Sequence, residues 1–145
     1  MGIIDFHGMS PYIPVRFRVA KRTPGEFAME LMVGYCGLDC AGCLIHQATL
    51  ERDEQKRYAM RSDVARICRE RYGLSVETDD VGDCDGCRSE TLFVTCARCE
   101  IRKCATGKNL VSCAFCGQYA CHLLQQIFIE DSGARGRLEK LRNHL

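Results

Sequence analysis

Several features common in globular domains are scarce in this chain. Trp is absent, and the three prolines all lie within the first 24 residues. The apolar share of 46% includes twelve cysteines, and without them it falls to roughly 38%, which is low for a globular domain. We therefore expect a thin conventional core, with metal–thiolate bonds helping to hold the fold together.

The chain also lacks long apolar runs. No stretch reaches the ~18 apolar residues of a membrane span, and the basic N-terminal region has no secretory pattern. We expect a cytoplasmic protein without membrane contact. Disulfides are rare in that reducing compartment, so twelve cysteines favour metal binding. The net charge of +1 does not indicate a nucleic-acid partner.

Cysteine distribution divides the chain in two. Residues 1–33 hold every proline and no cysteine, which predicts an irregular extension. Residues 34–145 form the expected cysteine-rich metal-binding domain. Apolar periodicity predicts three helices, with a stop at Gly73 and a short strand at 92–95. The expected helices span 46–72, 118–130 and 134–145. The fold class is therefore a small α-rich metal-binding domain, with irregular metal-organised cysteine loops and little β-sheet.

Apolar residues mark the inward face of each predicted helix. They are Leu50, Met60, Val64, Ile67 and Tyr72 in the first, Leu123, Leu124, Ile127 and Phe128 in the second, and Leu138, Leu141 and Leu145 in the third.

Four C-x2-C pairs carry the strongest chemical signal. This spacing places two thiolates on one tight turn, and zinc sites are commonly built from such pairs. Glycines at 42, 86 and 117 lie within or beside several pairs, where backbone N–H groups can approach the sulfurs. The predicted metal ligands are Cys36, Cys40, Cys43, Cys84, Cys87, Cys96, Cys99, Cys104, Cys113, Cys116 and Cys121.

The twelfth cysteine, Cys68, is interpreted as a small buried core residue, because it lies in the middle of a predicted helix beside Ile67. Two tetrahedral zinc sites need eight ligands and three need twelve. With eleven cysteines, a further ligand could come from His46, His122 or Cys68. The spacing is therefore compatible with two or three zinc ions.

The ligand pairing stays open. One arrangement joins the pair at 84 and 87 to the pair at 96 and 99, and the pair at 113 and 116 to Cys104 and Cys121. An interleaved arrangement fits nearly as well. The spacing C-x2-C-x4-C at Cys96–Cys104 recurs seventeen residues later at Cys113–Cys121, which indicates a duplicated loop-to-helix unit.

Iron–sulfur chemistry is the main alternative to zinc. Cys36, Cys40 and Cys43 have the C-x3-C-x2-C spacing of radical S-adenosylmethionine enzymes, but about 100 residues follow, too few for the barrel those enzymes use. The ferredoxin run C-x2-C-x2-C-x3-C is absent. Zinc is therefore favoured, and an iron–sulfur electron carrier or redox sensor remains the second hypothesis.

No catalytic set accompanies the cysteines: neither a Ser-His-Asp set nor a phosphate-binding glycine loop is present. Arg98, Arg102 and Lys103 lie beside the middle cysteines, where they could balance thiolate charge. We expect a structural-zinc binding or adaptor module rather than an enzyme, with an unidentified protein partner and an open oligomeric state. A metal- or thiol-handling protein is the third hypothesis.

Four cysteine motifs in order resemble a known family. The run from Tyr35 to Cys43 (YCGLDCAGC) resembles the opening signature of the cysteine-rich family called domain of unknown function 3795, and Cys84-Asp85-Gly86-Cys87 resembles its second motif. Residues 96–105 and 113–121 are similar to its third and fourth motifs, with Ala120 where the family often has Pro. The resemblance spans about residues 34–128. It implies metal binding, presumed to be zinc, through the same eleven cysteines.

Overall fold

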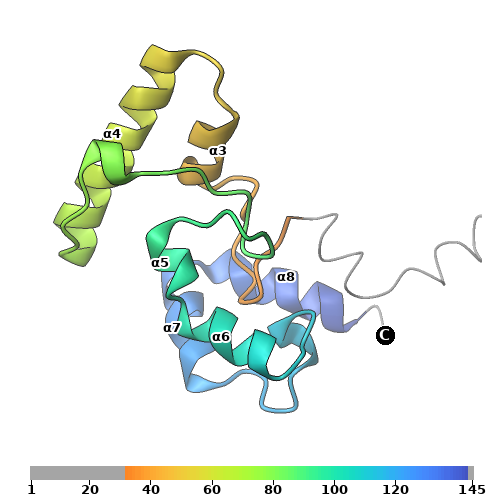
Figure 1. Ribbon diagram of the computed structural model, residues 1–145. Coiled ribbons are helices and arrows are strands. Elements are labelled where there is room, and N and C mark those ends of the chain that lie inside the picture. The colour runs from red at the N-terminus through yellow and green to blue at the C-terminus, as the bar shows by residue number, and fades with distance from the viewer. Residues whose placement is uncertain (1–31, 144–145) are drawn as a thin grey trace, which may run out of the picture.

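The computed structural model describes residues 32–143, which form six α-helices and two short 3-10 turns joined by irregular loops (Figure 1). The α-helices are α3 (Leu44–Leu50), α4 (Glu54–Tyr72), α5 (Val94–Ala97), α6 (Glu100–Gly107), α7 (His122–Glu130) and α8 (Ser132–Arg142), and the 3-10 turns are η2 (Thr78–Asp80) and η3 (Cys113–Phe115).

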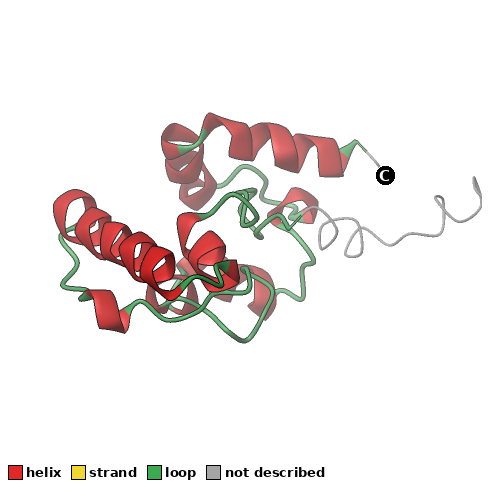
Figure 2. Ribbon diagram, turned by 90° about the horizontal axis from the view of Figure 1, so that it is seen from above, coloured by secondary structure: helices red, strands yellow, loops and turns green. Residues whose placement is uncertain are grey.

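The α-rich class is confirmed, and the predicted count of three helices is wrong. No strand occurs within residues 32–143, where the one extended pairing is an isolated bridge between Val33 and Asp39 (Figure 2). None of the helices in that range is both long enough and apolar enough to cross a membrane. The predicted extension falls almost entirely outside the described residues, as does Leu145.

The single helix predicted over 46–72 is two helices. α3 ends at Leu50, and Asp53 starts α4 by accepting the backbone N–H of Lys56 at 2.9 Å. The N–H of Asp53 itself bonds the Glu51 carboxylate at 2.9 Å. These side-chain bonds replace helical backbone bonds at the break, because Asp and Glu side chains compete for the same amides.

Gly73 ends α4 as predicted. It adopts a left-handed conformation with φ of 65°, and its N–H bonds the carbonyl of Arg69. Leu50 and Tyr72, predicted to face inward, are 59% and 54% exposed, because each occupies the last turn of its helix, beyond the packed face. Val64 is buried as predicted.

The strand predicted over 92–95 is wrong, because Val94–Ala97 form the single turn α5. Phe93 precedes that turn and is 2% exposed. One large buried side chain therefore accounts for the apolar signal, and no partner strand is needed.

Two separate hydrophobic cores organise the helices. The α4 core comprises Val64, Ala65, Cys68, Val76, Val81, Cys84 and Phe93. The C-terminal core comprises Cys36, Ile101, Ala105, Cys113, Ala114, Leu124, Leu138 and Leu141. Within residues 32–143, extensive contacts between elements occur inside each group: α3, α4 and η2 on one side, and α7, α8 and η3 on the other.

The cysteine loops lie between the two groups of helices. Figure 1 shows the loop before α3 and the loop before α5 side by side, with α3 and α4 on one side and α6 to α8 on the other. Arg137 of α8 donates to the carbonyl of Gly37 in the first loop at 3.0 Å. The same side chain bonds Asp131, the N-cap of α8, at 2.9 Å, so α8 is tied directly to a cysteine loop.

Candidate metal centre

Three tight turns shape the first cysteine loop. Gly34 donates to Leu38 at 2.9 Å, and Gly37, with φ of +91°, closes a further turn onto Gly34. The Asp39 carboxylate accepts the backbone N–H groups of Ala41 and Gly42 at 3.0 and 3.2 Å. Such turns are built from Gly and Asp because Gly allows positive φ and Asp bonds nearby backbone amides. The chain then enters α3 at Leu44, two residues before the predicted helix start at 46.

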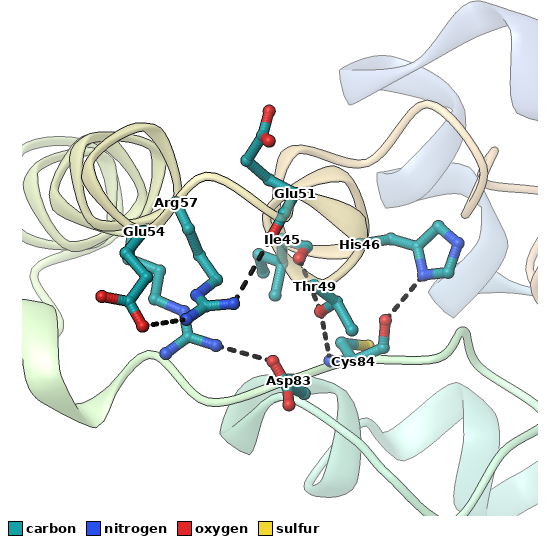
Figure 3. A network of polar contacts seen from close by, with 9 residues as sticks. Ile45, His46, Thr49, Glu51, Glu54, Arg57, Asp83 and Cys84 are labelled. Atoms are coloured by element: carbon teal, nitrogen blue, oxygen red, sulfur yellow. Dashed lines mark hydrogen bonds and ion pairs between the residues drawn. The ribbon is translucent and has the colours of Figure 1, made fainter.

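The second cysteine loop is fixed to α3 (Figure 3). Cys84 donates its backbone N–H to the Thr49 hydroxyl at 2.9 Å, and its carbonyl lies 2.7 Å from Nδ1 of His46. The neighbouring Asp83 pairs with Arg61 of α4 at 2.6 Å. Gly86, with φ of +96°, then turns the chain so that both Cys84 and Cys87 approach the first loop.

The two loops meet at glycines. A β-carbon placed on Gly34 would lie 3.4 Å from Cβ of Cys87 and 3.6 Å from Sγ of Cys40. A β-carbon on Gly86 would lie 3.7 Å from Cβ of Cys40. The glycines therefore bring Cys40 and Cys87, which are 47 positions apart in the sequence, into one neighbourhood. An adjoining cavity of about 290 Å³ is also lined by both cysteines.

Seven thiols lie near one another at this junction, and we call them the seven-cysteine cluster. Its members are Cys36, Cys40, Cys43, Cys84, Cys87, Cys96 and Cys99.

The thiols of Cys84 and Cys96 are neighbours. Their interaction lowers the pKa of Cys84 and raises the pKa of Cys96. At the other end of the cluster, burial raises the pKa of Cys36 to about 12, and charge on Cys87, Cys99 and Cys40 acts in the same direction.

Backbone groups lie near several of these sulfurs. Backbone groups of Leu38, Cys87 and Tyr35 lie near the sulfurs of Cys36, Cys40 and Cys87 respectively, and each lowers the thiol pKa against the larger effect of burial. Backbone groups of Phe93 and Gly86 also lower the pKa of Cys84, in addition to the larger effect of Cys96. N–H groups that donate to sulfur stabilise the thiolate form, which is the form that binds metal.

The remaining four predicted ligands surround a second site, which we call the four-cysteine cavity. Cys104, Cys113, Cys116 and Cys121 line a space of about 480 Å³ between α6, η3 and α7. Cys104 is exposed and Cys113 is buried. Burial raises the pKa of Cys113 to about 12, with charge on Cys36, Cys121, Cys116 and Cys104 adding to the effect.

Lys108 crosses the side of this cavity. Its ammonium group lies 4.0 Å from Sγ of Cys116 and donates to Gln118 at 2.9 Å. The backbone N–H of Gln118 also bonds the Cys116 sulfur at 3.4 Å. Sequence reasoning missed Lys108, although a lysine four residues after Cys104 is a recognisable source of positive charge.

The eleven cysteines therefore lie around two neighbouring sites, seven at the junction and four at the cavity, and the two sites adjoin at Cys36 and Cys113. The structure brings Cys104, Cys113, Cys116 and Cys121 together, as one of the two predicted arrangements required. In the larger group, Cys84 lies beside Cys96 and Cys87 is close to Cys99. The same group includes Cys36, Cys40 and Cys43, which therefore do not form a separate metal site of their own.

The two copies of the C-x2-C-x4-C unit are not equivalent. In the first copy, Cys99 caps α6 and Cys104 lies inside that helix. In the second, Cys113 lies in η3, and Cys121 caps α7 after an irregular stretch. The first copy contributes to both groups, whereas the second contributes only to the four-cysteine cavity.

Cys68 stands apart from both groups. It is 6% exposed in the α4 core, and burial raises the pKa of its thiol, with Arg69 rather than another cysteine as the neighbouring charge. This location matches the interpretation of Cys68 as a core residue.

The two candidate histidines differ in position. Nδ1 of His46 faces the Cys84 carbonyl, and its second ring nitrogen points away from Cys84 (Figure 3). His122 is exposed at the start of α7 and lines the four-cysteine cavity. His46 therefore braces the second cysteine loop, and His122 is the histidine beside a cysteine group.

Arginines flank the cluster at Cys87. Arg102, predicted from the sequence, donates to the Cys87 carbonyl at 3.0 Å. Arg88, which sequence reasoning missed, stacks on the Tyr35 ring at 4.5 Å. Its Nη2 atom is buried without a hydrogen-bond partner within residues 32–143. Burial raises the pKa of Cys87, and these two cations oppose that rise.

The clustered cysteines have the chemistry expected of ligands for a thiophilic metal, but their side chains are not arranged to bind one. Sulfur donors supported by amides and cations are typical of zinc and iron–sulfur sites. In the part of the chain that the structure describes, however, no three His, Cys, Asp or Glu side chains are arranged to hold a metal ion as they stand. Metal binding would therefore require neighbouring sulfurs to draw closer together and to lose their protons.

Comparison with known proteins supports one assignment. The model of the family described as Protein of unknown function (DUF3795) matches residues 32–126, which is more than half of the chain and includes all eleven clustered cysteines. No curated protein and no solved structure matches the sequence. The chain belongs to the DUF3795 family.

Proposed function

Starting from that family membership, we propose that the protein binds metal through its eleven clustered cysteines, with zinc as the preferred ion. The observation that carries this proposal is the clustering of the cysteines: eleven thiols have other cysteines as neighbours, whereas the charge that acts on the Cys68 thiol is that of Arg69. Small buried thiols that only fill space would have no reason to gather beside amides and arginines.

We propose a structural role for the metal. The seven-cysteine cluster lies between two cores, and its members pack with both: Cys84 belongs to the α4 core and Cys36 to the C-terminal core. Ions held there would connect two groups of helices that otherwise contact each other little. Metal binding would then contribute directly to folding, and the protein would act as a binding or adaptor module.

Metal analysis of the full chain tests this proposal. Protein purified without oxygen or added metal should contain two or three zinc ions per chain, without acid-labile sulfide. Cys99→Ser should lower the metal content, because it removes a clustered thiol. Cys68→Ser is the matched control and should keep the full content. Metal-free protein, or equal loss of metal in both variants, would contradict the proposal.

An iron–sulfur centre is the second candidate, favoured by one observation. The four-cysteine cavity, at about 480 Å³, offers more room than a single ion requires. Cysteine ligation of [4Fe–4S] clusters also uses four thiolates. Iron with a matching amount of acid-labile sulfide, lost on replacing Cys116 by Ser, would establish this candidate in place of zinc at that cavity.

A further inference from the structure

Tyr35 lies between the two cysteine sites and contacts both. Its carbonyl accepts the backbone N–H of Cys113 at 3.0 Å, so the first cysteine loop is bonded directly to η3. The guanidinium of Arg88 lies over its ring, 4.5 Å from the ring centroid. Tyr35 directly precedes Cys36 in the first loop, and Arg88 belongs to the second loop, directly after Cys87. One residue therefore links the seven-cysteine cluster to the four-cysteine cavity.

Arg88 is held against the first loop by two contacts. Its Nε atom donates to the carbonyl of Val33 at 3.3 Å, and its guanidinium stacks on the ring of Tyr35. Its Nη2 atom is buried and has no hydrogen-bond partner among residues 32–143. Burial of an unpaired N–H group is unfavourable, and stacking of a cation on an aromatic ring offsets part of that cost. Displacement of the second loop would therefore disturb Tyr35 as well.

The other side of the link is packed into the C-terminal core. Cys36 and Cys113 both belong to that core, and Tyr35 packs against it. Within η3, the carbonyl of Ala114 also accepts a hydrogen bond from Arg142 of α8. Close-packed interiors transmit displacements because they contain little free space. Movement of Cys36 would therefore displace the backbone of Cys113.

We propose that Tyr35 couples the two cysteine sites, so that metal bound at one site strengthens metal binding at the other. This inference rests on the proposed metal-binding function and adds cooperativity to it. An ion in the seven-cysteine cluster would order the first loop and fix Tyr35, whose carbonyl then holds Cys113 in place. The second ion would meet a site that is already partly ordered. The effect is the same in both directions, because coupling between two binding sites is reciprocal.

Chelator competition on the zinc-loaded full chain measures the coupling. Cys104→Ala disables the four-cysteine cavity with little effect on packing, because Cys104 is exposed. Amide NMR signals of residues 83–87 report zinc in the seven-cysteine cluster. In Cys104→Ala the cluster should bind zinc about tenfold more weakly than in the wild type, which lies within the range typical of coupled sites. Loss of zinc from the cavity with unchanged affinity at the cluster would overturn the coupling. A wild-type chain that holds no zinc would instead contradict the proposed function itself.

Variants at Tyr35 and Arg88 separate coupling from fold stability. Tyr35→Phe keeps the ring beneath Arg88, so Cys104→Ala should still weaken the cluster about tenfold. Tyr35→Leu removes the ring and Arg88→Lys removes the flat guanidinium while keeping its charge. In either background Cys104→Ala should have little effect on the cluster. Each comparison is made within one background, so a general loss of stability cancels. A tenfold effect that persists in both backgrounds would exclude Tyr35 as the coupling residue.

Hydrogen exchange tests the link at the bond itself. In Cys104→Ala, zinc binding at the seven-cysteine cluster should slow exchange of the Cys113 amide severalfold, because its bond to the Tyr35 carbonyl opens less often. The additional change Tyr35→Leu should abolish this slowing, and Tyr35→Phe should preserve it. An exchange rate at Cys113 that does not respond to zinc in the cluster would contradict the proposed link, even though the cluster would still bind metal.

Discussion

Two cysteines in the same core offer the sharpest test of metal binding. Cys68 and Cys84 are 6% and 5% exposed, and both belong to the α4 core. Replacing either by Ala removes one buried sulfur, which is close in size to a methylene group. Each change should therefore cost the metal-free protein about 1 kcal/mol of unfolding free energy. The two substitutions remove similar packing energy, so any further difference between their unfolding free energies is due to the loss of Cys84 from the seven-cysteine cluster.

Metal should separate the two variants. A ligand that binds only the folded state at a thousandfold excess over its Kd stabilises that state by about 4 kcal/mol. Cys68→Ala should retain this gain, because its thiol has no cysteine neighbour. Cys84→Ala should lose most of it, because it removes one ligand and leaves Cys96 without its thiol partner.

Denaturant unfolding measures both quantities under reducing conditions. Each variant is unfolded once in buffered zinc and once with a chelator, and the difference between the two free energies is compared with that of the wild type. Equal zinc-dependent gains in Cys68→Ala and Cys84→Ala would refute the reasoning, because two cysteines of equal burial would then be equivalent in function as well.

Two further perturbations probe the cysteine loops. Gly37→Ala should destabilise the protein by about 2–5 kcal/mol, because positive φ and a clash account for about 1–2 and 1–3 kcal/mol respectively. The new β-carbon would lie 2.8 Å from Cγ of Leu138. Gly73→Ala has positive φ but open space around it, so denaturant unfolding should show a loss of only about 1–2 kcal/mol, and equal losses would contradict the clash. The second perturbation is pH. Burial raises the pKa of Cys36 and Cys113 from 9.0 to about 12, so the unfolded chain loses these protons first. The metal-free protein should therefore be fully stabilised by these groups below pH 9 and lose stability as the pH rises towards 12. Unfolding free energies measured in chelator that stay level or increase over this range would show that the two thiols are not buried as neutral groups.

The candidate site was more predictable from the sequence than the fold. Short cysteine spacings (C-x2-C, with an x3 or x4 extension to Cys36, Cys104 and Cys121) identified the eleven cysteines that the structure brings near one another, because such spacing is a local property. The position of Cys68 followed from helical periodicity for the same reason. Whether cysteines far apart in the chain share a group depends on how the loops cross, and that crossing is set by close approach at Gly34 and Gly86.

The errors in secondary structure arise where one side chain decides between two local structures. Asp53 begins a new helix within a segment free of Gly and Pro, so periodicity alone predicts a single helix. Phe93 raises the β-strand propensity of residues 92–95. In the structure, however, Phe93 is buried in the α4 core just before one helical turn. In each case the tertiary contact or cap determines the outcome, and local propensity is only a weak guide.

Because the apolar residues form two separate cores, the cysteine loops between them are important for holding the two parts of the structure together. The segment from α3 to η2 spans residues 44–80, and segments of about 40 residues or fewer usually need a metal, a disulfide or a partner to fold alone. Cys84 places one sulfur in the core of that segment, and its loop is bonded to α3 through Thr49 and His46. The first loop reaches α8 through Gly37 and Arg137. Metal ions held between these two loops would therefore connect this short helical segment to the C-terminal core and add to its stability.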